Sequence, residues 1–331
     1  MKIVKWLSLF TVMVGIIFVI TLFYFDKKVH QSLSITEPSV YQVKSGQSAK
    51  GILNQLKAQG IITDNIGLKI RLKLEPELVN IKVGTYKLLP SMSALDLLAL
   101  FSSGKEMQFS ISLIEGLNWQ EWLIALKSHP QVLFTAEFHQ QLDELRESLP
   151  EQSIEGFLLP DTYYFVAQTK AIELVKRAHL SMQQYLNVAW QNRALDLPYT
   201  SAYEGLIMAS IIEKETGVAQ ERPRISGVFV NRLNLKMRLQ TDPTVIYGMG
   251  EKFDGNIRRK DLKAATPYNT YVIRRLPPTP IAMPSKLAID AAFNPITTDE
   301  LYFVSKGDGS HKFSTTLQEH NLAVRKYQLK K

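Results

Sequence analysis

Residues 201–217 read SAYEGLIMASIIEKETG, the stretch of the sequence that indicates a helix most clearly. Ser201 followed three residues later by Glu204 matches a capping box, in which each side chain accepts a hydrogen bond from the other residue's backbone N–H. Gly217 is typical of a helix end, because glycine adopts the left-handed backbone conformation without strain. The stretch therefore predicts a single helix that carries three carboxylates.

These carboxylates do not share one face of the predicted helix. At 100° per residue, Glu213 falls on a stripe of small and apolar side chains, whereas Glu204 and Glu215 fall near the opposite side. Burial disfavours the charged form of a carboxyl group, so Glu213 is a candidate acid–base catalyst near neutral pH. The alternative is an ion pair between Glu213 and an arginine of the following helix, Arg222, Arg224 or Arg232.

Two polar segments lie downstream of this helix. Gln240, Thr241 and Asp242 offer an amide, a hydroxyl and a carboxylate in a row, and Tyr268 and Asn269 add an aromatic face and a second amide. Such groups bind sugar hydroxyls, although solvated loops contain the same residue types. A stiff segment with prolines at 277, 278, 280 and 284 follows and is able to wall a groove.

Towards the N-terminus, Trp6–Phe25 is an uncharged run of apolar residues. At about 1.5 Å per residue it matches the thickness of the bilayer core, roughly 30 Å. A cleaved signal peptide is the main alternative, but its apolar region is usually shorter and a small-residue cleavage site follows it. We expect a single-pass membrane anchor, with the short tail 1–5 on one side of the membrane and nearly the whole chain on the other.

Composition excludes several classes of site. The chain has 331 residues, a formal net charge of +8 and no cysteine, which rules out disulfides and thiolate metal sites. The six histidines form no HExxH or HxH pattern, so no metal site is expected. The basic residues are scattered and form no nucleic-acid module, so we expect no nucleic-acid partner.

Residues 26–38 are polar and predict a linker, followed by a small module with its connector at residues 39–105. The stretch YQVKSGQS at 41–48 opens a strand–helix–helix–strand order that resembles the glycan-binding LysM module. Gln47 and Ser48 stand where that family usually has aspartate and threonine. Either a glycan-binding role or a purely structural role is open for this module.

Residues 106–331 alternate between helical and strand patterns and predict a catalytic domain of the α+β class. The expected strands include 107–113 and a hairpin at 301–305 and 312–314, and the stretch 237–241 has a strand-like pattern. The expected helices include 118–126, 172–190, 287–293 and 317–327.

Seven blocks in this domain occur in a fixed order: EGFLLPDTYYF, ASIIEKETG, SGVFVNRL, MRLQTDPTVIYG, YNTY, LPPTPIAMPS and LYFVSKGDGSHKFSTT. Together they resemble the YceG-like family of endolytic murein transglycosylases. The resemblance implies that Glu213, the first glutamate of the EKET block, is the catalytic acid–base. It also implies that Gln240, Thr241, Asp242, Tyr268 and Asn269 contact substrate, and that Glu215 supports Glu213 or faces solvent.

The reaction implied by this resemblance cuts the β-1,4 bond between N-acetylmuramic acid and N-acetylglucosamine inside a peptidoglycan strand, on the periplasmic side. The C6 hydroxyl of the muramic acid then closes on C1, so no metal or cofactor is needed and one glutamate suffices. The resemblance also implies that the anchor lies in the bacterial inner membrane with residues 1–5 as a cytoplasmic tail, and that peptidoglycan synthases are protein partners. Two alternatives are open: a hydrolytic muramidase with a second carboxylate such as Asp242, and a non-catalytic peptidoglycan-binding scaffold.

Overall fold

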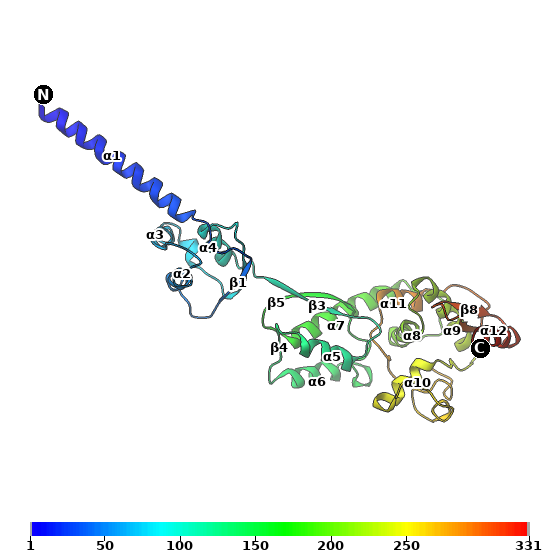
Figure 1. The fold of residues 1–331 in the computed structure, drawn as a ribbon. Helices are drawn as coiled ribbons and strands as arrows, with labels where there is room; N and C mark the ends of the chain where they lie inside the picture. The colour runs from blue at the N-terminus through cyan, green and yellow to red at the C-terminus, as the bar shows by residue number, and fades with distance from the viewer. Residues whose placement is uncertain (1, 330–331) are drawn as a thin grey trace. The chain divides into compact units, whose positions relative to one another are not determined.

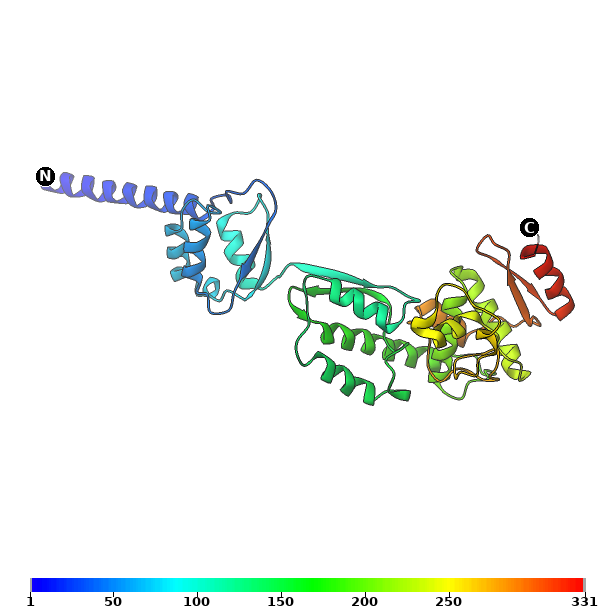
Figure 2. The same cartoon turned by 60° about the horizontal axis from the view of Figure 1, so that its bottom comes forward.

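The computed structural model describes residues 2–329 and divides the chain into two compact units (Figures 1 and 2). The first unit comprises residues 1–109 and 165–167, and the second comprises residues 110–164 and 168–331. Both contain helices together with short paired strands, so the α+β expectation is confirmed as a mixed arrangement.

The first unit begins with one long helix, α1 (Lys2–Val29). Within it, Leu9–Val29 is long and apolar enough to cross a membrane, and its side chains are exposed from Leu9 as far as Tyr24. The predicted span Trp6–Phe25 lies inside α1, but the helix continues for four residues past Phe25. Lys2 is already helical, and Met1 lies outside the described residues.

The segment expected as a linker is packed rather than free. Val29 and Leu33 are only 5% exposed and belong to the hydrophobic core of the first unit. Ser32 also forms an isolated β-bridge with Ser93. Because Val29 and Leu33 join this core, the end of α1 and the module form one unit. The mostly polar composition of residues 26–38 gave no sign of this packing.

The remaining elements of the first unit are β1 (Ser39–Val43), α2 (Ala49–Ala58), α3 (Ile66–Leu74), the 3₁₀ turn η1 (Pro76–Val79), β2 (Gly84–Leu88) and α4 (Ala94–Ser103). β1 and β2 pair antiparallel, from Ser39 opposite Leu88 to Val43 opposite Gly84. The Ser48 hydroxyl caps α2 by accepting from the backbone N–H of Gly51. The expected strand–helix–helix–strand order is therefore present, with α4 added after it.

The second unit opens with β3 (Gln108–Leu113), α5 (Trp119–Ser128), β4 (Val132–Leu133), α6 (Phe138–Glu147), β5 (Asp161–Val166), β6 (Thr169–Lys170) and α7 (Ala171–Gln191). β3 pairs with β5, and β4 runs parallel to β6. Asn118 and Glu121 form a complete capping box that fixes the start of α5.

The core of this unit surrounds α8 (Ala202–Glu215), the helix predicted from the central stretch. α7, α9 (Arg222–Asn234), α10 (Asp242–Met249) and α11 (Lys286–Phe293) all pack against α8. Gly205 is required in α8, because a Cβ there would lie 2.1 Å from Cε1 of Phe293. Nine consecutive residues, Gly205–Glu213, are buried, so α8 has no solvent-facing stripe along that length.

The unit ends with the expected hairpin, β7 (Tyr302–Ser305) and β8 (His311–Ser314), and with α12 (Leu317–Tyr327). The expected strand at 237–241 is absent from the described structure, where α10 begins at Asp242 instead. Proline favours the first turn of a helix as well as a turn, and Pro243 occupies that position here. Short 3₁₀ turns lie at Pro150–Gln152, Ala219–Glu221, Gly250–Lys252 and Asp261–Lys263.

Candidate active site

Glu213 lies one turn before the end of α8, and both of its carboxylate oxygens are occupied. Oε1 accepts from Nη2 of Arg222 at 2.8 Å, in an ion pair whose two side chains are only 8% and 4% exposed. Oε2 accepts from the backbone N–H of Ser285 at 2.9 Å and from the Ser285 hydroxyl. The ion pair left open by the sequence is therefore present, and it involves Arg222.

This arrangement ties three elements together. Arg222 opens α9 and Ser285 caps α11, so Glu213 connects the ends of both helices to α8. The Cγ of Glu213 lies 3.8 Å from the position of a Cβ at Gly116. A buried pair of this kind contributes mainly by avoiding an unpaired buried charge. The catalytic role of Glu213 stays a prediction.

Glu215, the last residue of α8, lies in different surroundings. It lines a cavity of about 550 Å³ together with Gln240, Thr241 and Asp242, so the structure brings four of the predicted site residues together. Oε1 of Glu215 accepts a short hydrogen bond from the Thr241 hydroxyl. Glu213 is not among the described residues that line this cavity.

Burial raises the pKa of Glu215 to about 7, and the nearby charge of Asp242 raises it further. The Thr241 hydrogen bond acts in the opposite direction, as do the cationic groups of His311 and Arg232. A carboxyl group with this pKa exchanges its proton near neutral pH, as a general acid–base requires. Glu215 therefore has the property that sequence periodicity had assigned to Glu213.

The segment at 240–242 is held by a cluster of threonine hydroxyls. The backbone N–H of Thr241 donates to the Thr270 hydroxyl at 3.0 Å, and that of Gln240 donates to the Thr270 carbonyl at 3.2 Å. The Thr244 hydroxyl donates to the Thr241 carbonyl at 2.8 Å. Gln240 has a φ of 53°, a left-handed backbone that these hydrogen bonds stabilise.

The YNTY block contributes a different residue from those expected. Tyr271 lines the cavity, and its hydroxyl donates to Oδ1 of Asp242 at 2.6 Å. Tyr268 packs instead against Tyr247, with ring centroids 5.0 Å apart. Asn269 is buried, and its amide donates to the carbonyl of Ala264 at 2.7 Å, so it supports the loop. Substrate contacts by Tyr268 and Asn269 stay predictions.

The far wall of this cavity comes from the C-terminal hairpin and α12. His311 lines it and lies 2.7 Å from the Glu221 carboxylate through Nδ1. The buried Arg232 donates to the carbonyls of Leu301 and Leu239, both at 2.6 Å. Sequence reasoning did not single out His311 or Arg232 for this site, because each lies far along the chain from α8.

A second cavity of about 870 Å³ lies at the N-terminus of α5 and holds another buried carboxyl group. Both oxygens of Glu155 lie 3.2 Å from the backbone nitrogen of Trp119, and the Tyr247 hydroxyl donates to one of them. Burial raises the pKa of Glu155 to about 7. The sequence signal was the EGFLLPDTYYF block, in which this glutamate was not singled out.

Comparisons with known proteins identify the family. The model of the YceG-like family matches residues 41–326. A Bacillus subtilis protein named endolytic murein transglycosylase is 30% identical over 308 residues, which cover 86% of this chain and 83% of that protein. A Streptococcus pneumoniae protein of the same name is 26% identical over 317 residues, and the match covers 85% of this chain and 57% of that relative.

A solved structure gives a similar result. The crystal structure of a YceG-like protein from Listeria monocytogenes superimposes with a TM-score of 0.54 and 28% sequence identity, covering 86% of this chain and 99% of the other. The resemblance carried by the seven ordered sequence blocks is confirmed, and the chain belongs to the YceG-like family.

Proposed function

We propose that this chain is a peptidoglycan lyase that cuts inside glycan strands, at the β-1,4 bond between N-acetylmuramic acid and N-acetylglucosamine. The names of the relatives support this reaction class. The observation that carries the proposal is the Glu215 carboxyl group, with a pKa near 7 in a cavity lined by Gln240, Thr241 and Asp242. The amide, hydroxyl and carboxylate groups suit the hydroxyl-rich surface of a sugar chain.

In the proposed mechanism, protonated Glu215 donates its proton to the glycosidic oxygen as the bond to C1 breaks. The Glu215 carboxylate then accepts the proton of the muramic C6 hydroxyl, whose oxygen bonds to C1 and gives a 1,6-anhydro end. The hydroxyl is already part of the substrate, so no water has to be activated. The Thr241 hydrogen bond stabilises the intervening carboxylate.

Glu213 has a positioning role in this proposal. Its two oxygens already accept hydrogen bonds from Arg222 and Ser285, so both are engaged by other parts of the protein. By holding α9 and α11 against α8, it fixes the end of the helix from which Glu215 projects. This differs from the role implied by the sequence resemblance, so an experiment has to separate the two glutamates.

The test is digestion of un-crosslinked glycan strands by the full chain in detergent, with the released ends identified by mass spectrometry. We expect anhydro ends from the wild type and at least a ~100-fold loss of rate for Glu215→Gln, the size of a lost general acid. Glu213→Gln is the matched control, because it makes the same chemical change two residues away on the same helix. It should retain cleavage wherever circular dichroism shows a folded protein.

Other outcomes have definite meanings. Folded Glu213→Gln without activity, beside active Glu215→Gln, would return the acid–base role to Glu213. Reducing ends, heavier by one water than anhydro ends, would indicate a hydrolytic muramidase with Asp242 as the candidate second carboxylate. No cleavage by the wild type would favour a peptidoglycan-binding scaffold.

Four further features of the proposal are supported by the sequence resemblance alone. They are a periplasmic location of the catalytic unit, glycan binding by the LysM-like module, action on nascent strands to end or trim them, and contact with peptidoglycan synthases. Each stays a prediction. The long apolar helix α1 is consistent with a single-pass membrane protein.

A further inference from the structure

Helix α3 of the first unit exposes an apolar face that the described residues of that unit leave uncovered. Ile66 is 56% exposed, Ile70 37% and Leu74 69%, and these side chains recur every four residues along one side of the helix. Leu68 and Leu72 point the other way and are buried in the core. A nine-residue helix with apolar side chains on two faces can contact two apolar environments, of which the core of the unit is one.

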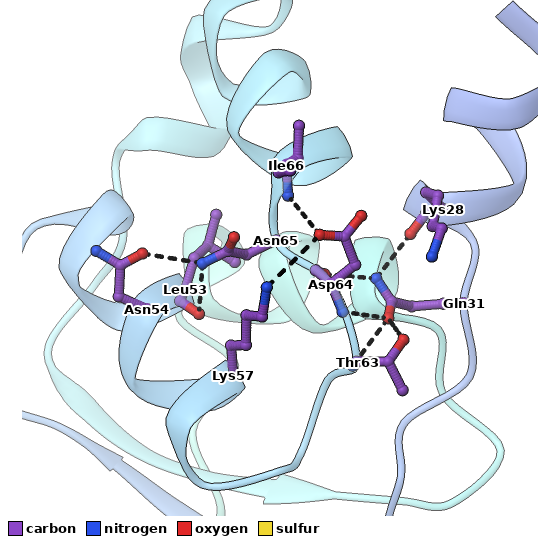
Figure 3. A network of polar contacts seen from close by, with 9 residues as sticks. All are labelled: Lys28, Gln31, Leu53, Asn54, Lys57, Thr63, Asp64, Asn65 and Ile66. Carbon is purple, nitrogen blue, oxygen red and sulfur yellow. Dashed lines mark hydrogen bonds and ion pairs between the residues drawn. The ribbon is translucent and has the colours of Figure 1, made fainter. Parts of the chain in front are cut away.

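The start of α3 is fixed to the end of α1 by the side chain of Gln31 (Figure 3). Its amide nitrogen donates to the carbonyls of Lys28 at 2.7 Å and Asp64 at 2.6 Å. Its amide oxygen accepts from the backbone N–H groups of Thr63 and Asp64, both at 3.0 Å. One glutamine thus joins the last turn of α1 to the loop that precedes α3.

The two helices also touch directly. A Cβ at Gly67 would lie 3.2 Å from Cγ2 of Val29 and 3.5 Å from the carbonyl oxygen of Phe25. These distances leave little room for a side chain at position 67, so α3 approaches α1 closely there. Phe25 and Val29 belong to the last turns of the segment that is apolar enough to span a bilayer. The first turn of α3 therefore lies at the depth where that segment leaves the apolar layer.

The charges around the exposed face match an anionic lipid surface. Lys69 and Lys73 lie on α3, Lys27 and Lys28 lie in the last turn of α1, and α3 contains no acidic residue. Basic side chains close to a membrane surface are attracted to anionic headgroups, while apolar ones enter the boundary with the acyl chains.

We propose that α3 lies on the bilayer beside the exit of α1, with Ile66, Ile70 and Leu74 inserted at the boundary of headgroups and acyl chains. The first unit then has two attachments to the membrane, the spanning helix and this interfacial helix. The second attachment holds the module against the lipid surface. The proposal rests on α1 crossing a bilayer and is independent of which glutamate performs the chemistry.

The absence of cysteine makes a direct test possible. Single cysteines replace Ile70, Val40 or Phe18 in the full chain, and each carries an environment-sensitive fluorophore in nanodiscs that contain one copy and anionic lipid. Val40 is the matched control, since it is 58% exposed on β1, which Figures 1 and 2 place on the side of the module away from α1. Phe18 reports insertion of α1 itself.

We expect lipids with a nitroxide near the headgroup to quench the probe at Ile70 at least ~2-fold more than the probe at Val40, and aqueous iodide to show the reverse order. Equal quenching by iodide of the probes at Ile70→Cys and Val40→Cys would overturn the proposal. Shielding of Ile70 from iodide without quenching by nitroxide lipid would also overturn it and point to a protein occupant. Failure of deep nitroxide lipids to quench Phe18 would remove the membrane span on which the proposal depends.

A second variant tests the role of the charges with the same label. Replacing Lys69 and Lys73 by glutamine in the Ile70→Cys protein should reduce the quenching by nitroxide lipid in anionic nanodiscs. The same substitutions should have little effect in nanodiscs of neutral lipid. An equal effect in both lipids would contradict the role given to these charges.

Discussion

Asp242→Asn and Thr241→Val should shift the pH dependence of cleavage in opposite directions, because each removes a group that acts on the proton of Glu215. The pKa of this carboxyl group is about 7, compared with an ordinary value of 4.5. The difference corresponds to about 3 kcal/mol in favour of the protonated form. If protonated Glu215 is the acid, kcat/KM should be half-maximal near pH 7 and fall about tenfold per pH unit above it.

The charge of Asp242 raises the pKa of Glu215, so its replacement by the neutral amide should move the alkaline limb of the profile to lower pH. The Thr241 hydroxyl donates to the carboxylate and lowers the pKa, so its replacement by valine should move the same limb to higher pH. The assay measures anhydro ends released between about pH 4 and pH 9, with folding of each variant checked by circular dichroism.

The pH at which kcat/KM is half-maximal is the quantity that tests the proposal, because both variants should also lose rate through weaker substrate contacts. A wild-type limb near pH 4.5 would show that burial does not perturb Glu215 in the functional protein. Shifts of the two variants in the same direction would mean that the group in control of the limb is not in contact with both side chains.

Three further substitutions test the packing and the second buried carboxyl group. Glu213→Ala leaves Arg222 buried without its partner and should lower the free energy of unfolding by about 3–5 kcal/mol. Unfolding in urea measures this change, and a loss below about 1 kcal/mol would contradict the prediction. Gly205→Ala places a Cβ against the Phe293 ring and should cost about 1–3 kcal/mol, seen as a lower Tm, and an unchanged Tm would disprove the close contact. The pKa of Glu155 is raised to about 7, so this carboxyl group should remove up to about 3 kcal/mol of stability as pH rises from about 4.5 through 7. Glu215 contributes a similar loss to the wild type and to Glu155→Gln, so Glu155→Gln should lose less stability than the wild type by the share of Glu155, and parallel stability–pH curves would exclude this effect.

Sequence reasoning succeeded where the deciding interactions are local. The Ser201 hydroxyl accepts from the backbone N–H of Glu204 as the capping pattern predicts, and α8 starts at the next residue. The helix predicted at 317–327 has those bounds in the structure, with a capping box from Thr316 to Glu319. Hydrogen bonds between residues three or four apart determine these features, so the amino-acid order contains the information.

The loop segments were less predictable, because contacts between residues far apart in the sequence determine their structure. The stretch before Asp242 has strand-like alternation, but no partner strand lies beside it, and hydrogen bonds from Thr270 hold it instead. Thr270 is about thirty positions away, and its hydroxyl acts as a substitute for a neighbouring strand. A pattern with period two predicts a strand only where such a partner exists.

The two glutamates of the EKET block show why the site was harder to predict than the fold. Helical periodicity correctly places Glu213 and Glu215 on different faces of the helix. It identifies a catalytic face only if one side of the helix is apolar and the other is exposed to solvent. α8 is buried all round from Gly205 to Glu213, so an apolar neighbourhood distinguishes nothing there. The difference arises from residues outside the helix.

Arg222 and Ser285 occupy both oxygens of Glu213, whereas Glu215 meets a single hydroxyl and a cavity. At Glu215 burial outweighs the Thr241 hydrogen bond and the nearby charges that lower the pKa, which is raised to about 7. A buried carboxyl group becomes an acid near pH 7 only when its burial is incompletely compensated. These surroundings support the proposed role of Glu215, and they depend on contacts that join distant parts of the chain.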